Sequence, residues 1–468
     1  MGSGFDLNLV PDPVRVVEAI NRHAEELTAA GAYDRYIGNL ATIDIDHPRV
    51  REFVGAKANG VKLPHLNLSV NIGEEFMAVL ADGKPFTLRD GTLVPASLLW
   101  AEIVQAAWQC GDPGVLFLDR YNEDNPTPTV GRYSTTAPCA EVGLAPGESC
   151  VFGYLNLGEF LNGQHEPAID FELLGEVARL LVRVLDNALE RSLDYYPNPS
   201  SQAVMRAKRR IGIGIVGFAD LLIRLGVPYD APKATKILQD ILIMVTFASK
   251  LASMELAQQR GSFLAFAQSR YALSPDFLSR KYGGVDTDVV SLQDWQALEQ
   301  RIRTTGHLRN ASTTALPPSG RSSLLLDASP SLEPWFSPFD LGGELKPHLV
   351  ALVERHCETG DEVRQLLAEI SSRGTCQLPG VVPTAIQALV KCATELAPMD
   401  HLRVVAAATR CVDDSASKTV NLPRDASLDV VNELLLTAWR FRLKAISVYR
   451  DGAINGQPEA LGSVRASS

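Results

Sequence analysis

SLLWAEIVQAAWQCGDPGVLFL, residues 97–118, carries a helix, a turn and a strand in immediate succession. Residues 97–110 are helical, the Gly-Asp-Pro-Gly turn at 111–114 stops that helix, and residues 115–118 form a short, fully apolar strand. The same alternation of helices and strands continues on both sides of this segment. We therefore expect a sheet or barrel that is wrapped by helices.

The neighbouring segments supply the other predicted elements. Asp12 caps a helix that starts at Pro13 and ends near Gly31. Strands are predicted at 39–44, 65–72, 419–422 and 445–448, and further helices at 50–58, 171–193, 233–259, 347–367, 383–393 and 401–412. Residues 125–147 are rich in Pro, Thr and Gly and lie between a strand and a long amphipathic helix, so they form an excursion inside one domain.

The composition is that of an ordinary folded protein. The 468 residues are 46% hydrophobic and 21% charged, which excludes a disordered or collagen-like chain. The net charge of -11 offers no positive field for a nucleic acid polymer. The seven cysteines include no Cys-x-x-Cys, so neither a disulfide framework nor a metal site is expected. Because no signal peptide or membrane-length apolar run is recognised, we expect a cytoplasmic protein without membrane contact.

Gly212-Ile213-Gly214-Ile215-Val216-Gly217 satisfies the G-x-G-x-x-G pattern of dinucleotide-binding folds. That pattern should follow a buried strand, whereas residues 202–210 are polar and basic. The favoured alternative is a tight helix start that contains glycine and packs on a neighbour.

Thr135-Thr136-Ala137-Pro138-Cys139-Ala140-Glu141 places a thiol and a carboxylate two residues apart, and Cys150 follows eleven residues after Cys139. In an extended segment Cys139 and Glu141 would face the same side, where they could serve one substrate as a sulfur-centred reactant and a base. The alternative is that both cysteines are small packing residues in the core.

Pro317-Pro318-Ser319-Gly320-Arg321-Ser322-Ser323 combines small hydroxyl side chains, a glycine and an arginine. Such a set suits a phosphate cradle built from backbone N–H groups, hydroxyls and one guanidinium. A polar surface turn would have the same composition.

Several separated stretches resemble the catalytic subunit of adenosylcobalamin-dependent (class II) ribonucleotide reductases. They keep the family's order and approximate spacing from about residue 12 to about residue 455. The stretches are IDIDHP (43–48), NLSV (67–70), DPGVLFLDR (112–120), DNPTP (124–128), APCAE (137–141), RRIGIGIVGFADLL (209–222), the loop at 318–323, SKTVNLP (417–423) and VYRDG (448–452).

The resemblance implies a ten-stranded α/β barrel of the ribonucleotide reductase and glycyl radical type over residues 1–458, with a central finger loop at about 134–150 and a flexible tail at 459–468. It implies that adenosylcobalamin generates a thiyl radical at Cys139, which abstracts the 3′-hydrogen of a ribonucleotide. Glu141 would take the 3′-hydroxyl proton. Cys150 would be one of two cysteines that supply electrons as they form a disulfide.

The resemblance also implies the substrate contacts. Asn67 and Ser69 match a strand near the sugar, and Ser319, Gly320, Arg321, Ser322 and Ser323 match the loop that holds the phosphates. Ala137 stands where the family has an asparagine that hydrogen-bonds the sugar hydroxyls. Losing such a bond, about 1–3 kcal/mol, predicts roughly 5- to 150-fold slower turnover of an ordinary ribonucleotide.

Other departures concern the family's regulatory and redox segments. The N-terminal elements with the second redox cysteine, and often an ATP cone, are expected to be absent. The segment between Leu9 and Val14 is shorter than the family's effector loop, and no cysteine pair follows Gly452. The resemblance therefore describes a shortened and diverged member of the family.

Two functions follow from these features. One is radical reduction of ribonucleotides to 2′-deoxyribonucleotides, or a closely related radical conversion of a nucleotide; retention of Cys139 and Glu141 favours it. The other is a non-catalytic paralogue that binds nucleotide or pairs with a complete subunit. The predicted partners are a ribonucleotide, a thioredoxin-like thiol reductant or a second polypeptide with the missing cysteine, and a second copy of the chain in a homodimer.

Overall fold

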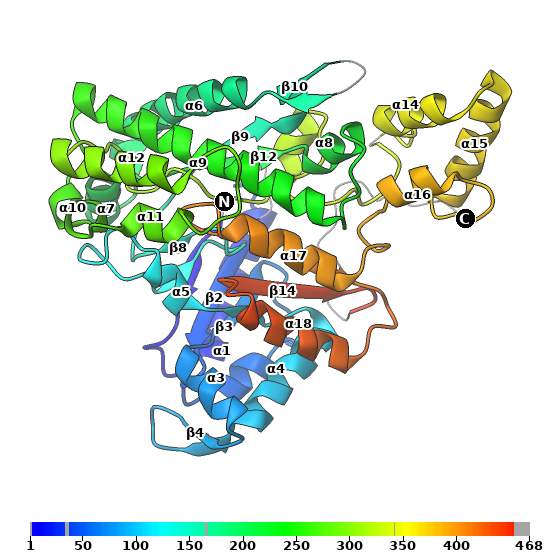
Figure 1. Ribbon diagram of the computed structural model, residues 1–468. Coiled ribbons are helices and arrows are strands. Elements are labelled where there is room, and N and C mark those ends of the chain that lie inside the picture. Colours follow the sequence, from blue (N-terminus) through cyan, green and yellow to red (C-terminus); the bar gives the residue numbers. More distant parts are fainter. Residues whose placement is uncertain (1, 33–36, 164–166, 341, 454–468) are drawn as a thin grey trace.

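The computed structural model describes residues 2–32, 37–163, 167–340 and 342–453 (Figure 1). The predicted tail at 459–468 lies outside the described residues. The central sheet has the order β1 (Gly4–Asp6), β2 (Asn39–Asp44), β3 (Leu66–Asn71), β6 (Gly114–Leu116), β14 (Ala445–Arg450) and β13 (Thr419–Leu422). Neighbours are parallel except β6 and β14, so two sets of parallel strands run in opposite directions.

Residues 312–317 extend the second set of strands. The Leu316 N–H donates to the Ser415 carbonyl (3.0 Å), and Thr314 bridges in parallel to Ile213. Ile213 lies in β12 (Ile211–Val216), which pairs in parallel with β9 (Val151–Asn156). One curved hydrogen-bonded surface thus runs from β1 to β9. Among the described residues no pairing joins β9 to β1.

The two faces of this surface differ in the size of their side chains. Leu68 and Val70 of β3 are buried against helices on the outer face. On the inner face Thr42, Ser69 and Gly114 lie side by side on adjacent strands. A Cβ at Gly114 would lie 3.0 Å from the hydroxyls of Ser69 and Ser447. Because these inner side chains are small, the inside has room for an inserted loop.

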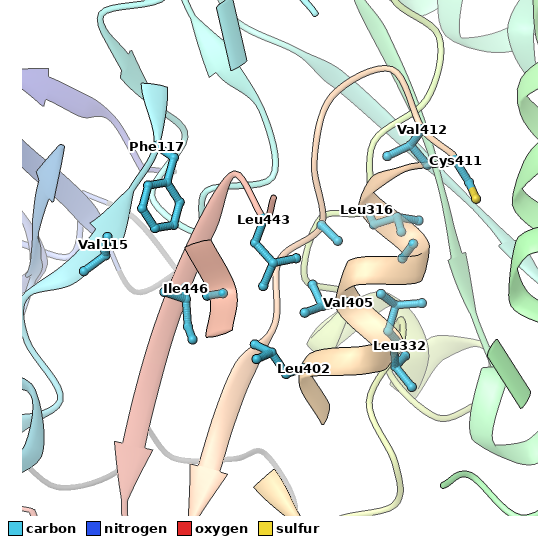
Figure 2. Close-up of a cluster of buried hydrophobic side chains, with 14 of the residues drawn as sticks. Val115, Phe117, Leu316, Leu332, Leu402, Val405, Cys411, Val412, Leu443 and Ile446 are labelled. Atoms are coloured by element: carbon cyan, nitrogen blue, oxygen red, sulfur yellow. The ribbon is translucent and has the colours of Figure 1, made fainter. Parts of the chain in front are cut away.

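Helices pack around the strands and on one another. They are α1 (Pro13–Ala29), α2 (Val50–Gly55), α3 (Glu74–Ala81), α4 (Ala96–Cys110), α5 (Leu118–Glu123), α6 (Phe171–Ser192), α7 (Pro199–Lys208), α8 (Phe218–Arg224), α9 (Pro232–Arg260), α10 (Arg270–Leu273), α11 (Phe277–Tyr282), α12 (Leu292–Thr305), α17 (Pro398–Thr409) and α18 (Leu428–Arg440). Figure 2 shows how Leu402 and Val405 of α17 lie among the buried side chains near Leu443 and Ile446.

Most predicted elements are confirmed, including the Asp12 cap, whose carboxylate accepts the Arg15 N–H (3.1 Å). The strand predicted at 115–118 is shorter, because α5 already begins at Leu118. Helix α9 is long and apolar enough to cross a membrane, but 67% of its most apolar window is buried inside the protein. It is therefore a core helix, packed on α6.

The single helix predicted at 347–367 is wrong, because two helices occupy this region. They are α14 (Pro347–His356) and α15 (Gly360–Arg373). Thr359 caps α15 in a reciprocal capping box with Glu362, and a cap requires a non-helical backbone at that position. With α16 (Thr384–Leu389) these helices form a small second core at one side of the molecule, to which α8 contributes Ala219 and Ile223 (Figure 1).

The G-x-G-x-x-G segment at 212–217 lies mostly in a strand, β12. Only its last glycine stands at the start of a helix. All of β12 is buried, and a Cβ at Gly212 would lie 2.7 Å from the Phe152 ring of β9. This glycine therefore lets two strands approach each other. Only Gly217, with φ +80°, precedes a helix, α8. The expected helix start is thus correct for the last glycine alone.

Candidate active site

The finger loop is a β-hairpin that enters the ring of strands. Its arms, β7 (Thr135–Thr136) and β8 (Gly143–Leu144), are antiparallel. The Thr42 hydroxyl on the inner face of β2 donates to the Thr135 hydroxyl (3.1 Å). At the base, Tyr133 and Ala145 pack in one apolar cluster with Leu116 of β6. These contacts hold the loop inside the barrel.

The tip is a tight turn and not the extended segment assumed from the sequence. Ala140 has φ +61°, and its N–H donates to the Ala137 carbonyl (2.9 Å). A left-handed non-glycine residue costs about 1–2 kcal/mol. The Tyr121 hydroxyl donates to the Ala140 carbonyl, and the Ser415 N–H donates to the Glu141 carbonyl (3.0 Å). Contacts from two other segments therefore hold this turn between Cys139 and Glu141.

Cys139 is an accessible thiol at the tip of the loop. Its side chain is exposed, whereas Ala137 and Glu141 are buried. Desolvation by the surrounding protein raises the pKa of the thiol to about 12, and the charge of Glu141 adds to this effect. At neutral pH the residue therefore keeps its S–H bond, which a hydrogen-atom donor and acceptor needs.

Glu141 has the properties of a base. It is 5% exposed, and its Oε2 atom has no hydrogen-bond partner. Burial raises the pKa of the carboxyl to about 7, the negative charge of Asp414 adds to the rise, and backbone N–H groups oppose it. A carboxyl with an unused acceptor atom and a pKa near neutrality is suited to exchange a proton with a ligand.

Cys150 lies directly before β9 as a half-buried free thiol. It packs beside an apolar cluster that contains Ala137, Val142 and Ala315. Burial raises the pKa of Cys150 well above its usual value. Cys150 thus lies at the C-terminal end of the finger loop, and its redox role stays a prediction.

The predicted sugar contacts lie on β3. Asn67 is exposed and Ser69 is buried, and both belong to the inner-facing row of this strand. Ala137 packs with Val142 and Ala315. Its methyl group therefore packs against apolar side chains.

The predicted phosphate loop follows directly from residues 312–317. Ser319 is the N-terminal cap of α13 (Gly320–Leu325), and its buried hydroxyl has no hydrogen-bond partner. The Ser323 hydroxyl donates to the Gly320 carbonyl (3.0 Å). Gly320 and Arg321 are exposed, and Ser322 is half-buried. The loop therefore presents one unused buried hydroxyl and one accessible guanidinium.

The sequence did not single out the polar residues that hold the loop in place. They are Tyr133, Arg210, Asp414 and Ser415, which contact its base and its tip. One signal was present: Arg210 stands directly before an apolar run, where a charge is costly unless it is paired. The partners come from distant segments, so the pattern alone did not identify them.

Comparisons with known proteins agree with this geometry. A family model described as the barrel domain of ribonucleotide reductase matches residues 10–449. A vitamin B12-dependent ribonucleoside-diphosphate reductase from Mycobacterium tuberculosis is 36% identical over 429 residues, which is 89% of this chain and 57% of that protein. One from Thermoplasma acidophilum is 29% identical over 88% of this chain and 51% of that protein. The chain thus spans little more than half the length of these relatives.

The fold is shared with a solved structure. The class Id ribonucleotide reductase alpha subunit of Actinobacillus ureae aligns over 89% of this chain and 71% of that chain, with a TM-score of 0.68 and 19% identity. This agreement confirms the predicted ribonucleotide reductase type of α/β barrel. Because the family match covers nearly the whole chain and the fold agrees with it, the chain belongs to the ribonucleotide reductase family.

Proposed function

We propose that this chain is the radical-bearing barrel of an adenosylcobalamin-dependent ribonucleotide reductase, which converts ribonucleotides to 2′-deoxyribonucleotides. The tip of the finger loop carries the proposal. There an accessible Cys139 thiol adjoins a buried Glu141 carboxyl with an unused oxygen and a pKa of about 7. A hydrogen-atom acceptor and a base held in one turn suit abstraction of a sugar hydrogen with simultaneous deprotonation of its hydroxyl.

The proposed steps use three residues of this chain. The Cys139 sulfur takes the 3′-hydrogen of the ribose, and the Glu141 carboxylate takes the 3′-hydroxyl proton. The 2′-hydroxyl then takes a proton from one of the two thiols that become a disulfide, and it leaves as water. Net reduction requires two electrons, and Cys150 supplies one of the two thiols that become a disulfide. The second thiol comes from another cysteine or from an external dithiol.

The substrate contacts are proposed from the same geometry. The unused Ser319 hydroxyl and the accessible Arg321 guanidinium would bind phosphate oxygens, together with Gly320, Ser322 and Ser323. Asn67 and Ser69 face the inside of the barrel, where the ribose would lie. Ala137 contributes only a methyl group to this pocket, so the sugar hydroxyls lack the amide that the family provides.

The residues present fit adenosylcobalamin. The exposed Cys139 side chain can be reached by a second molecule, and the inner residues Ser69, Gly114 and Ser447 are small and lie side by side on neighbouring strands. When bound, the cofactor would supply the one-electron chemistry that converts the Cys139 thiol to a thiyl radical. The relatives' names state vitamin B12 dependence, which supports this assignment.

A non-catalytic paralogue is not favoured. Such a protein has no use for a desolvated carboxyl whose oxygen lacks a partner, because an isolated buried acceptor destabilises the fold. A thioredoxin-like reductant, a homodimer and a cytoplasmic location remain predictions.

The test is paramagnetic resonance combined with stopped-flow cobalt absorbance, using adenosylcobalamin and each of several ribonucleotides. We expect a radical signal and exchange of the 3′-hydrogen in the wild-type chain, and neither in Cys139→Ser. Cys357→Ser is the matched control, because this half-buried free thiol lies beside the separate α14–α16 core. If the wild-type chain gives no radical with any nucleotide at saturating cofactor, the proposal fails.

A further inference from the structure

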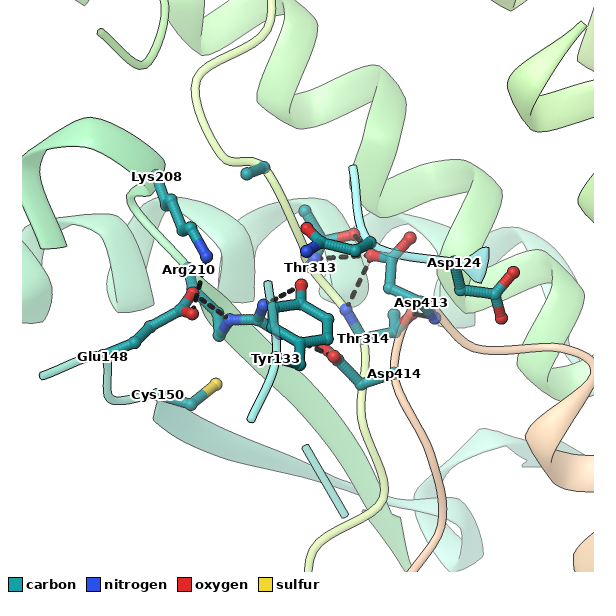
Figure 3. Close-up of polar contacts among 12 residues, drawn as sticks. Asp124, Tyr133, Glu148, Cys150, Lys208, Arg210, Thr313, Thr314, Asp413 and Asp414 are labelled. Atoms are coloured by element: carbon teal, nitrogen blue, oxygen red, sulfur yellow. Dashed lines mark hydrogen bonds and ion pairs between the residues drawn. The ribbon is translucent and has the colours of Figure 1, made fainter. Parts of the chain in front are cut away.

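We propose that Arg210 is a positioning residue that sets the place of Cys139 and Glu141 by joining both ends of the finger loop to the segment that holds its tip. The catalytic part of this inference rests on the proposed function. The contacts that carry it are properties of the structure and are testable without substrate (Figure 3).

Arg210 binds both ends of the finger loop at once. One terminal nitrogen donates to the hydroxyl of Tyr133, just before the first arm, and Nε donates to the Glu148 carboxylate (2.8 Å), just after the second. Lys208 donates to the other oxygen of Glu148 (2.7 Å). The guanidinium therefore fixes the separation between the start and the end of the hairpin.

The same guanidinium also binds the segment that touches the tip. Its second terminal nitrogen donates to both oxygens of Asp414 (2.6 and 2.5 Å). The next residue, Ser415, donates its N–H to the Glu141 carbonyl (3.0 Å). A shift of Arg210 would therefore move the base and the tip of the loop together.

Burying the four charged side chains around Arg210 costs desolvation free energy, and a gain in stability does not by itself explain why they are buried. The side chains of Lys208 and Glu148 are 0% exposed, Arg210 is 1% and Asp414 is 3% exposed. Two cations and two anions balance each other, yet a buried ion network is often no more stable than a well-packed apolar one. Directional bonds to a planar guanidinium do give geometric precision.

A second buried cluster offers an internal comparison. Asp186 pairs with Arg209 (2.8 Å) and Arg309 (3.2 Å) among α6, α9 and the residues before the phosphate loop. It has the same chemistry as the Arg210 network. Within the described residues, the ion pairs of Asp186 are made with Arg209, Arg260 and Arg309, none of which belongs to the finger loop. The distinguishing feature of Arg210 is therefore its contact with both ends of the finger loop and with Asp414.

The test compares Tyr133→Phe with Tyr271→Phe. Both remove a buried hydroxyl hydrogen bond within the charged core; Tyr271 donates to the Ala311 carbonyl (2.7 Å) and does not touch the finger loop. The first readout is the alkylation rate of Cys139 by iodoacetamide at pH 9, followed by peptide mass spectrometry without nucleotide or cofactor. We expect the rate in Tyr133→Phe to rise at least about threefold as the tip loosens, and that in Tyr271→Phe to stay unchanged.

The second readout is steady-state turnover. We expect kcat in Tyr133→Phe to fall about 10- to 100-fold because the reacting groups are displaced, with an unchanged KM because the phosphate loop lies outside the network. Arg210→Lys keeps the positive charge but loses the planar set of N–H donors. We expect its kcat to fall at least as far as that of Tyr133→Phe. If Tyr133→Phe and Tyr271→Phe have equal alkylation rates, the positioning role is overturned, whether or not the wild-type chain is active. If alkylation differs but the wild-type chain makes no radical, the proposed function alone fails.

Discussion

Replacing Glu141 by glutamine should stabilise the folded protein at high pH while it abolishes turnover. Burial raises the pKa of this carboxyl from 4.5 to about 7, so between these values the folded chain binds more protons than the unfolded chain. The free energy of unfolding therefore falls as the pH rises through this window, and the full penalty is present above it. At 1.36 kcal/mol per pH unit, the penalty is roughly 3 kcal/mol.

Glutamine has nearly the same shape and no charge, so it removes the penalty. We expect little difference between wild type and Glu141→Gln near pH 4.5 and a gain approaching roughly 3 kcal/mol at pH 8. With about 2.1 cal/mol/K of unfolding entropy per residue, a chain of 468 residues that unfolds cooperatively gains roughly 3 °C in Tm. Differential scanning calorimetry at several pH values between 5 and 8.5 measures this difference.

Glu148→Gln is the matched control on the same loop. Burial disfavours its charge, but Arg210 and Lys208 outweigh that effect and lower the pKa of Glu148. Its neutralisation leaves the buried Lys208 ammonium without its anionic partner and Arg210 with Asp414 alone, so stability at pH 8 should fall by about 3–5 kcal/mol. Opposite signs for the two variants would confirm that environment, and not residue type, decides the outcome. A Glu141→Gln difference that is destabilising at pH 8, or that does not depend on pH, would refute the reasoning.

Three further outcomes are expected. Arg321→Ala should weaken nucleotide binding in calorimetry without lowering Tm, because this exposed side chain is predicted to bind phosphate; unchanged affinity would put the phosphate elsewhere. Gly212→Ala should lower Tm by several degrees and alter the alkylation rate of Cys150, since the new Cβ would lie 2.7 Å from Phe152 and 3.2 Å from the Cys150 sulfur. Wild-type Tm in that variant would show that β9 and β12 can separate. Deoxynucleotide formation by this chain should need an added dithiol, and formation of one deoxynucleotide per chain without any added thiol would show that the chain itself supplies the partner of Cys150.

Local order along the chain could be predicted from the residues alone. The strands at 39–44 and 419–422 and the capped helix at Pro13 agree with expectation, because alternation, periodicity and capping act between residues a few positions apart. The resemblance to a family also identified Cys139 and Glu141. The prediction of a single helix at 347–367 was wrong, although helix capping is also a local rule. The capping box at Thr359, which starts a second helix, was not recognised.

The chemistry of the site, by contrast, was decided by the tertiary structure. The positive φ of Ala140, the orphaned oxygen of Glu141 and the inward row of small residues depend on which segments fold against the finger loop. Arg210 meets Glu148 across 62 residues and Asp414 across 204. No pattern of neighbouring residues encodes such pairs. They arise because a buried charge is tolerated only where the completed fold brings a counter-charge to it, and the same desolvation sets the pKa of Glu141 near neutrality.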